Sequence, residues 1–325
     1  MVTYLITGAT GMIGGLVINT LIDSEEYING NIRIIAIVRN ISKFQTIFKG
    51  RDCRNVKLIE QYIEKELNIS DEIDYIIHCA AITRSSLMIS NPVEVANGIV
   101  LGTHNMLQLA KEKSIQSMVY ISSMEVYGVV EDDGKRRSED ELGRIEINNS
   151  RSCYPLAKRV AEHYCHIYNK EYGVPVKIVR LAQTFGKGVD VNDSRVYMQF
   201  AKAVCDNTDI ILRTDGKSMG NYCDSEDAIN AIFTILTRGI DGEAYNVVNE
   251  ENTMSIYEMA KMVAKDIANN KINVYVKPED AVTTGYAPNT GLRLSSAKLN
   301  ALGWYAQKNL KQMYETIIEI ILKNG

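Results

Sequence analysis

The sequence predicts an α/β protein built on a doubly wound parallel sheet, followed by a smaller C-terminal α/β domain. Two observations support this prediction. Short apolar runs alternate with helical patterns up to residue 180, and a glycine-rich turn joins the first run to the first helix. Almost wholly apolar strands are typical of sheets that helices cover on both faces. Beyond residue 181 the alternation loosens, which indicates a second domain.

The elements are predicted in chain order. Strands are expected at residues 2–7, 32–38, 73–79, 117–122 and 176–181, and helices at 16–22, 92–113 and 154–172, the last ending at Gly173. The second part is predicted to contain a helix near 195–206, a strand at 209–213 and a final helix at 309–323. We therefore assign residues 1–180 to the first domain, with 221–250 returning to it, and residues 181–325 to the second.

The composition is that of an ordinary folded protein, with 325 residues, 46% hydrophobic and 23% charged, and a net charge of −4. Nucleic-acid-binding proteins usually carry a basic surplus, so charge gives no support for a nucleic-acid partner. The charge-free stretch 4–22 reaches membrane-spanning length, but its four glycines argue against one continuous helix. Six cysteines without CxxC spacing indicate mostly buried, reduced thiols. We expect no membrane partner and a cytoplasmic location.

A glycine motif, Thr7-Gly8-x-x-Gly11-x-x-Gly14, lies between the first strand and the first helix. Backbone N–H groups at a helix N-terminus can hold a pyrophosphate, and glycine permits its close approach. The position directly after a strand favours a dinucleotide site over a plain tight turn. The first domain is thus predicted to be a Rossmann-type dinucleotide-binding domain. The cofactor-binding residues expected in this turn are Gly8, Thr10, Gly11, Met12, Ile13 and Gly14.

The second strand ends in Val38-Arg39-Asn40. An NAD-selective site expects an acidic residue here to bind the ribose hydroxyls, whereas an arginine can face a 2′-phosphate. Arg39 is either such a contact or a solvent-exposed arginine at a strand end, and we weigh the two equally. On the first interpretation NADP(H) is favoured over NAD(H), with Arg39 and Asn40 among the cofactor-binding residues.

Tyr154-x-x-x-Lys158 places two side chains one turn apart on one helix face. A tyrosine with a pKa of about 10 is a poor base at neutral pH, and a nearby ammonium stabilises its phenolate. The same tyrosine can donate its proton when a reaction runs toward the alcohol. Taken alone, the spacing also fits a chance surface pair. Together with Ser123 at the end of a predicted strand, where a hydroxyl can bind a substrate oxygen, the set becomes specific.

These motifs resemble those of the extended short-chain dehydrogenase/reductases that act on nucleotide-activated sugars, and the resemblance covers nearly the whole chain. Besides the turn, it includes His78-Cys79-Ala80-Ala81, Ser122-Ser123-Met124-Glu125-Val126-Tyr127-Gly128, Tyr154-Pro155-Leu156-Ala157-Lys158 and Leu302-Gly303-Trp304. Residues 152–159 and 192–196 look closest to UDP-glucuronate decarboxylases. Glu125 falls where those enzymes and dTDP-glucose 4,6-dehydratases carry a catalytic glutamate.

The resemblance implies hydride transfer between a sugar carbon and a nicotinamide, in the synthesis of polysaccharide precursors. It implies Tyr154 as acid/base, Lys158 as its activator and ribose anchor, and Ser123 as the partner of the substrate oxygen. It also implies a homodimer that pairs through helices 92–113 and 154–172. The remaining expected site residues are Ala80 and Ala81 for the cofactor, and Met124, Gln183, Arg195, Tyr222 and Arg293 for the nucleotide sugar.

The chain departs from this family pattern at four positions. Ile99 replaces an asparagine three residues before the Gly-Thr pair, Gln183 replaces the asparagine after Arg180, and the other two departures bear on the reaction. Met124 stands where the dehydratases carry the aspartate that protonates the leaving hydroxyl, and Gly220 stands where related enzymes carry an arginine for the diphosphate or a sugar carboxylate. The hypotheses of dehydration and of decarboxylation are therefore less well supported, and Arg195 or Arg293 would have to neutralise a diphosphate. Glu125 is either a proton carrier or a hydrogen-bonded carboxylate at a strand end, and both interpretations stay open.

Three functional hypotheses follow. Arg39 and the two departures that bear on the reaction favour NADPH-linked net reduction of a nucleotide-linked keto sugar or ketose, because family members that return the hydride they take keep a bound NAD. The alternative is a 4-epimerase or 4,6-dehydratase that recycles tightly bound NAD. A third is a non-catalytic cofactor-binding regulator, against which the retention of Tyr154, Lys158 and Ser123 argues.

Other polar and aromatic groups are given structural interpretations. His163, Cys165 and His166 do not converge on one ion, so no metal site is expected. His78, after an apolar strand, is interpreted as structural or cofactor-lining rather than as a base. The polar stretch 129–150 is predicted to be a surface loop with solvated charges. Tyr222 can stack on a base or sugar, although aromatic residues more often belong to the core.

Overall fold

The computed structural model describes residues 1–278 and 289–324, and these form two compact units. The first unit contains Met1–Val126, Ile145–Arg180 and Ile229–Tyr245, and the second contains Tyr127–Arg144, Leu181–Ala228 and the residues from Asn246 onward. The chain thus passes into the second unit after Arg180 and returns to the first at 229–245. Segment 127–144, which the sequence-based division left in the first domain, belongs to the second unit.

A seven-stranded sheet carries the first unit, with strand order β10-β6-β5-β4-β1-β2-β3. Its strands are β1 (Val2–Thr7), β2 (Ile32–Val38), β3 (Val56–Glu60), β4 (Tyr75–His78), β5 (Ser117–Ser123), β6 (Val176–Leu181) and β10 (Ala244–Val247), the last running on into the second unit. β3, β2, β1, β4 and β5 pair in parallel. The strand order reverses between β1 and β4, which is where open sheets of this kind bind ligands at the carboxyl ends of the strands.

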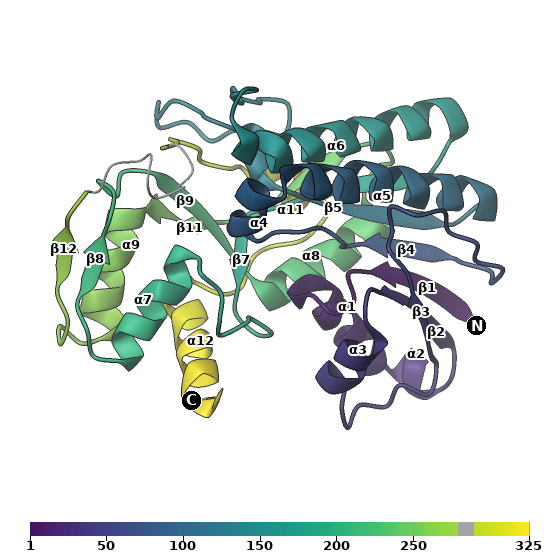
Figure 1. Ribbon diagram of the computed structural model, residues 1–325, viewed down its shortest axis with the longest axis horizontal. Helices are drawn as coiled ribbons and strands as arrows, with labels where there is room; N and C mark the ends of the chain where they lie inside the picture. The colour runs from purple at the N-terminus through teal and green to yellow at the C-terminus, as the bar shows by residue number, and fades with distance from the viewer. Residues whose placement is uncertain (279–288, 325) are drawn as a thin grey trace. The chain divides into compact units, whose positions relative to one another are not determined.

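Helices cover this sheet, as the alternating pattern predicted. They are α1 (Met12–Ile22), α2 (Glu25–Ile28), α3 (Ile41–Ile47), α4 (Ser85–Ser90), α5 (Pro92–Lys113), α6 (Cys153–Tyr172) and α8 (Ser225–Arg238). Figure 1 shows α5 and α6 side by side on one face of the sheet and α1 on the other. The buried side chains of Ile99, Met106 and Ala161 pack these two helices onto Ile76 and Met118 of the strands. α6 ends at Gly173, whose φ of 68° is in the left-handed region.

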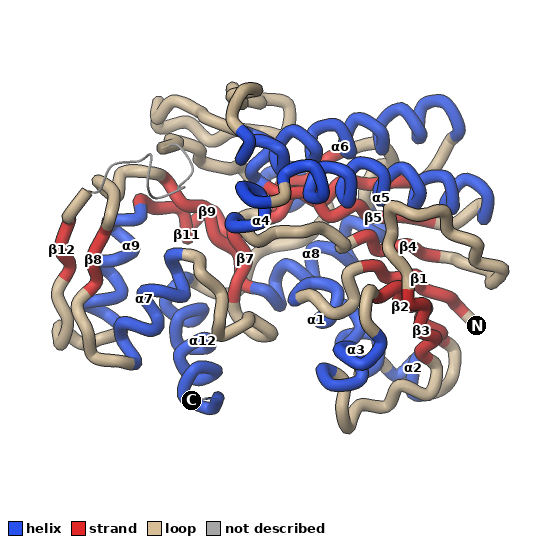
Figure 2. Tube along the Cα trace, in the orientation of Figure 1, coloured by secondary structure: helices blue, strands red, loops and turns tan. Residues whose placement is uncertain are grey.

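The described residues of the second unit form two small sheets, whose strands are red in Figure 2. β11 (Asn249–Ser255), β9 (Met219–Asp224) and β7 (Gln183–Phe185) form one, and β12 (Val274–Val276) and β8 (Ile210–Leu212) form the other. Its helices are α7 (Val196–Cys205), α9 (Ile256–Met262), α11 (Ala297–Asn300) and α12 (Leu310–Asn324). Phe185 stacks on Tyr197 with ring centroids 4.3 Å apart, and Tyr222 and Tyr314 meet Phe185 edge-on. These rings form an aromatic core.

The polar segment 127–144 is anchored rather than loose. The carboxylate of Glu139, 7% exposed, accepts the Asn246 N–H at 2.8 Å. Arg136 pairs with Glu250 at 2.8 Å, and Arg137 forms an isolated bridge with Leu294. The prediction that the charges of this stretch are solvated is therefore wrong for Glu139. The segment packs as part of the second unit because its charged groups find partners that the sequence pattern does not reveal.

None of the helices described is both long enough and apolar enough to cross a membrane. All six cysteines are free thiols, but only Cys165 and Cys223 are buried, so the expectation that most of them are buried is wrong.

Candidate active site

The glycine turn between β1 and α1 is closely packed. Gly8 has a φ of +68°, and a Cβ on it would lie 2.9 Å from the amide nitrogen of Ala80. A Cβ on Gly14 would collide with the carbonyl oxygen of Gly8. The turn closes through a 2.9 Å hydrogen bond from the Gly11 N–H to the Gly8 carbonyl. At position 8 only glycine fits without displacing the backbone that follows β4, and at position 14 only glycine fits without displacing the turn at Gly8.

The N-terminus of α1 is open to an anion. Gly11 is its N-cap, no side chain caps it, and its first turn contains no acidic residue. Gly8, Thr10, Gly11, Met12 and Ile13 are all at least partly exposed. The first N–H groups of a helix lack partners within the helix and carry partial positive charge. The glycine turn and the N-terminus of α1 therefore fit the pyrophosphate of a dinucleotide, which backbone N–H groups would hold.

A chain of buried hydrogen bonds connects the end of β1 to β4 and α5, beside the glycine turn. The Thr7 hydroxyl lies 2.7 Å from Nδ1 of His78 and accepts the Ala80 N–H at 3.1 Å, and Nε2 of His78 lies 3.3 Å from the Thr103 hydroxyl. Burial, together with the nearby Lys158 cation, lowers the pKa of His78 to about 3. His78 is thus a neutral imidazole that joins β1, β4 and α5, in line with its structural interpretation. Ala80 and Ala81 follow it, both partly exposed.

Arg39 follows β2 directly and is exposed. Asn40 caps α3, because its side-chain oxygen accepts the Lys43 N–H at 2.8 Å. The side chain of Asn40 is therefore already used locally, whereas the Arg39 guanidinium has no hydrogen bond or ion pair with the described residues.

Tyr154 and Lys158 come together on α6, as the spacing predicted. Lys158 is 2% exposed, and its ammonium donates to the Ile121 carbonyl on β5 at 2.6 Å. The ammonium lies 4.7 Å from the centroid of the Tyr120 ring and 5.8 Å from that of the Tyr154 ring. Burial lowers the pKa of Lys158 to about 8, and the nearby Glu162 partly opposes this shift. A cation held beside a tyrosine favours the phenolate form of that tyrosine.

A second buried cluster, which the sequence analysis did not identify, lies beside this pair. Glu162 accepts the Ser122 hydroxyl at 2.5 Å and the guanidinium of Arg180 at 2.8 to 3.2 Å. Glu162 is one helical turn beyond Lys158, so the spacing of four residues could have indicated the neighbourhood. Its partners on β5 and β6 carry no local sequence signal.

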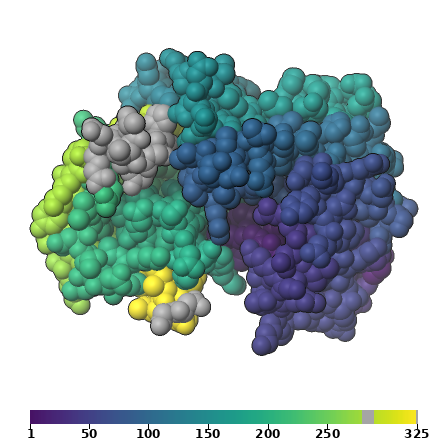
Figure 3. Space-filling model, in the orientation of Figure 1, coloured from purple at the N-terminus to yellow at the C-terminus, as the bar shows by residue number. Residues whose placement is uncertain are grey.

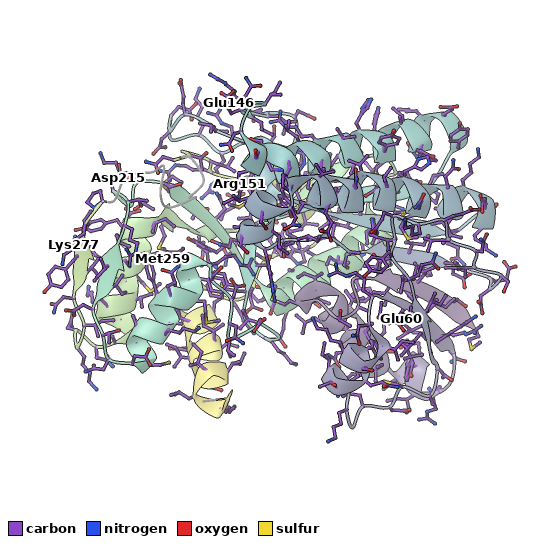
Figure 4. The ribbon with its side chains drawn as sticks, in the orientation of Figure 1. Glu60, Glu146, Arg151, Asp215, Met259 and Lys277 are labelled. Atoms are coloured by element: carbon purple, nitrogen blue, oxygen red, sulfur yellow. The ribbon has the colours of Figure 1, made fainter. Side chains whose placement is uncertain are left out.

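At the end of β5, Ser123 and Met124 are partly exposed, and the Ser123 hydroxyl accepts the Glu125 N–H at 3.2 Å. The carboxylate of Glu125 is held by Arg151, labelled in Figure 4 just before α6, through hydrogen bonds of 2.5 and 3.0 Å. Burial alone would lower the pKa of Arg151, but the hydrogen-bonded Glu125 carboxylate more than offsets this and raises it. Arg151 was not among the predicted site residues.

Arg195 and Arg293, the expected diphosphate ligands, lie in the second unit and each has an aspartate partner. Arg195 binds Asp193 through two nitrogens, and the Nε atom of Arg293 lies 3.3 Å from Asp132. Arg293 lines an open cavity of about 480 Å³. The other lining residues are Asp132, Asp215 (labelled in Figure 4), Gly216, Lys217, Met219, Ser255, Tyr257, Glu258 and Val276.

Gln183 and Tyr222 are neighbours in the second unit, paired across β7 and β9. Gln183 is partly exposed, whereas Tyr222 is fully buried and its hydroxyl has no partner among the described residues. A Cβ on Gly220 would collide with that hydroxyl. Gly220 is therefore required by the position of Tyr222, and the assignment of Tyr222 to a substrate remains a prediction.

Within the described ranges, no group of three or more His, Cys, Asp or Glu side chains could hold a metal ion. The doubly wound sheet with the glycine turn at its switch point has the arrangement of dinucleotide-binding domains, and the Tyr154–Lys158 pair lies on α6 of the same unit. The family model of the NAD dependent epimerase/dehydratase family matches residues 4–248, and the chain belongs to this family. The predicted resemblance, fold and membership of an NAD-dependent enzyme family are confirmed.

Curated relatives include a decarboxylase and a dehydratase. UDP-glucuronic acid decarboxylase 1 of Danio rerio is 28% identical over 278 residues, covering 85% of this chain and 63% of that protein. The same enzyme of Xenopus tropicalis is 27% identical, with 80% and 59% covered. The chain thus spans about three fifths of the length of these two relatives. dTDP-D-glucose 4,6-dehydratase of Homo sapiens is 26% identical over 98% of this chain and 90% of that protein.

Solved structures share the fold over the whole chain. The dTDP-glucose 4,6-dehydratase from Bacillus anthracis in complex with NAD has a TM-score of 0.79 and 20% identity, covering 100% of this chain and 97% of that one. The UDP-glucuronic acid 4-epimerase from Bacillus cereus, in complex with UDP-glucuronic acid and NAD, has a TM-score of 0.80 and 19% identity, covering 99% and 100%.

Proposed function

We propose that the protein is an NAD(P)-dependent oxidoreductase that acts on a nucleotide-activated sugar, and that it catalyses NADPH-linked net reduction of a keto sugar or ketose. The observation that carries the catalytic part is the buried Lys158 ammonium, 5.8 Å from the ring centroid of Tyr154. The relatives named for their nucleotide-sugar substrates support the substrate class.

The cofactor would be held at the glycine turn. The turn residues Gly8, Thr10, Gly11, Met12, Ile13 and Gly14 would surround the pyrophosphate, and Ala80 and Ala81 would line the site after β4. Bound there, a nicotinamide dinucleotide would supply or accept a hydride. Arg39 would bind a 2′-phosphate, since it is exposed and no described residue pairs with it.

The proton chemistry would belong to Tyr154. In the direction of reduction its hydroxyl donates a proton to the oxygen of the substrate, and the resulting phenolate is stabilised by the Lys158 ammonium. Ser123 would orient the same substrate oxygen. Glu125, held by Arg151 through two hydrogen bonds, would serve either as an anchor for the end of β5 or as a proton carrier.

The nucleotide end of the substrate is assigned to the second unit. Arg293 and Arg195 would contribute positive charge and Gln183 a polar contact, and the family pattern assigns Met124 to the sugar. The aspartate partners of both arginines reduce the net charge that they offer, so binding would depend on their directional N–H groups as well as on charge. These assignments follow the family pattern of residue positions.

The second candidate is a 4-epimerase or 4,6-dehydratase that recycles tightly bound NAD. The names of the solved relatives favour it, because they include such enzymes in complex with NAD. Absorbance at 340 nm with NADPH or NADH and a panel of nucleotide keto sugars separates the two candidates. Stoichiometric loss of NADPH supports reduction. Sugar conversion without loss of reduced cofactor, together with NAD released from the purified protein on denaturation, would establish recycling instead.

A homodimer through α5 and α6 is part of the proposal. Figure 3 shows α4 and α5, in blue, at the surface of the face that it views. Apolar side chains on α5 and α6 are exposed to solvent, among them Val93, Leu101 and Val160. Exposed apolar side chains on two packed helices are compatible with a subunit interface there. Sedimentation equilibrium of wild type and Leu101→Lys would test it, and a variant that stays as associated as wild type argues against this interface.

A further inference from the structure

We propose that Glu162 is a positioning residue, whose carboxylate, locked by Ser122 and Arg180, supplies the buried negative charge that keeps Lys158 protonated beside Tyr154. The inference rests on the proposed role of Tyr154 and Lys158. Glu162 is not one of the predicted site residues, and its hydrogen-bond partners are Ser122 and Arg180.

The position of Glu162 is fixed from two strands. The Ser122 hydroxyl donates to one carboxylate oxygen at 2.5 Å, and Arg180 of β6 donates to both oxygens at 2.8 to 3.2 Å. Glu162 is 7% exposed. Glu162 thus forms a buried ion pair with Arg180. Its carboxylate is held in one place inside the protein and does not lie free at the surface.

The same strand presents Lys158 to this anion. Lys158 donates to the carbonyl of Ile121, and Glu162 accepts from the hydroxyl of the next residue, Ser122. On α6 the two side chains are four residues apart, a spacing that puts them on one face. Two consecutive residues of β5, just before Ser123, therefore contact α6: Ile121 accepts from the Lys158 cation, and Ser122 donates to the Glu162 carboxylate.

The surroundings of Lys158 make this anion necessary. The titratable groups around the ammonium are Tyr120 on β5, Tyr154 and Cys165 on α6, and His78 and Cys79 at the end of β4, with Glu162 as the carboxylate. Burial lowers the pKa of Lys158 to about 8, and Glu162 acts in the opposite sense. Burial raises the pKa of Cys79 to about 12, so its thiol is neutral and supplies no anion.

The expected consequence has a definite sign. Lys158 stabilises the Tyr154 phenolate only while it is protonated, so this assistance is lost as the pH rises through the pKa of Lys158. Without the Glu162 charge, desolvation would act unopposed and that pKa would fall further, by about one unit or more. The ammonium would then lose its proton near neutral pH.

The primary test measures Lys158 directly and needs no substrate. The protein is labelled with ¹³C at the ε-carbon of lysine, and the Lys158 signal is identified by its loss in Lys158→Met. Glu162→Gln is expected to lower the pKa of Lys158 by about one unit or more, and Glu162→Asp, which keeps the charge, should restore it. A Glu162→Gln protein that folds and titrates like wild type overturns the proposal.

Two further variants keep the test decisive. Glu162→Gln removes the buried carboxylate that pairs with the Arg180 cation, which can prevent folding. If it does, Glu162→Gln/Arg180→Gln takes its place: the pKa of Lys158 should still fall, by less than in the single variant, and an unchanged value overturns the proposal. Glu139→Gln is the matched control, because Glu139 is also 7% exposed but lies in the second unit, and it should leave the Lys158 titration unchanged.

Turnover is the second readout. If the proposed reaction is found, the alkaline limb of the kcat profile should move to lower pH in Glu162→Gln together with the Lys158 titration, with little change in KM. A purely structural role would lower the unfolding temperature and the amplitude of the profile without moving the limb. If no turnover is found, the proposed function fails, while the lysine titration still decides the role of Glu162.

Discussion

Arg151 donates two hydrogen bonds, of 2.5 and 3.0 Å, to the carboxylate of Glu125. The pair thus joins the end of β5 to the segment that precedes α6. Both side chains are mostly buried. This pair connects the strand end that carries Ser123 to the helix that carries Tyr154. The relative position of the two predicted catalytic groups thus depends on a contact between residues that are 26 positions apart in the chain.

The Glu125–Arg151 pair should show strong energetic coupling. Glu125→Gln or Arg151→Met alone leaves one charge without its partner, and each is expected to lower the free energy of unfolding by about 1 to 3 kcal/mol. The double variant should lose less than the sum, because no unpaired charge remains. Urea denaturation of the four proteins measures this, and additive losses would show that the pair contributes no coupling.

Tyr154→Phe should lower turnover by about 10² or more and leave cofactor affinity nearly unchanged, because it removes only the proton-transfer group. Steady-state rates and fluorescence titration with the cofactor measure the two effects separately. An equal loss of cofactor affinity would contradict this role. Unchanged activity would revive the hypothesis of a non-catalytic regulator.

Arg39→Asp should shift preference from NADPH toward NADH, because the substitution replaces a cation that can bind a 2′-phosphate with a carboxylate that can bind ribose hydroxyls. The ratio of kcat/KM for the two cofactors is the readout. Arg51→Asp is a suitable control, since Arg51 is another exposed arginine of the first unit and is paired with Asp23. Equal selectivity in wild type and Arg39→Asp would mean that the guanidinium has no role in cofactor choice.

Gly14→Ala should weaken cofactor binding by about tenfold or more, because the new Cβ would press on the Gly8 carbonyl and displace the turn. Gly98→Ala is the matched control within α5, where a Cβ would have nothing within 4 Å. That variant should bind normally and gain up to about 1 kcal/mol of stability. Isothermal titration with NADPH and with NADH compares them, and equal affinities would exclude the turn as the pyrophosphate site.

His78 should make the protein sensitive to acid. Its pKa is about 3 in the folded state against about 6.5 in the unfolded chain, so the unfolded state binds more protons between these values and stability falls as the pH drops below 6.5. The loss at low pH is of the order of 3 to 5 kcal/mol. Thermal unfolding between pH 4 and 7 should show a shallower pH dependence in His78→Gln. His166→Gln, at an exposed position, should keep the wild-type slope, and equal slopes in all three proteins would rule out His78 as the source.

Local sequence patterns were sufficient to predict those elements whose conformation depends on consecutive residues. The bounds of α5 and β6 agree with the predicted helix 92–113 and strand 176–181, because their apolar periodicity and flanking residues are local. The pyrophosphate turn could be placed for the same reason, since its glycines, strand and helix are consecutive. The Tyr154–Lys158 contact follows from helix geometry alone.

The hydrogen-bond and ion-pair partners of the site residues could not be predicted from local sequence patterns. Segment 127–144 has mixed charges typical of a solvated loop, yet Glu139 is buried against Asn246, 107 positions away. Arg195 and Arg293 were predicted as diphosphate ligands, and the structure gives each an aspartate as well. Whether a charge is paired depends on which side chains the fold brings within reach.

The sequence by itself determined the fold class, the family and the residues at the centre of the proposed chemistry, because these depend on order and spacing along one strand, turn or helix. Only the tertiary structure decided the electrostatic setting of those residues. Lys158 obtains its acceptor from β5, and Glu162, its neighbour on α6, is fixed by β5 and by Arg180 on β6. Electrostatic interactions act through space in a region of low dielectric, so their strength follows from burial and distance rather than from position in the chain.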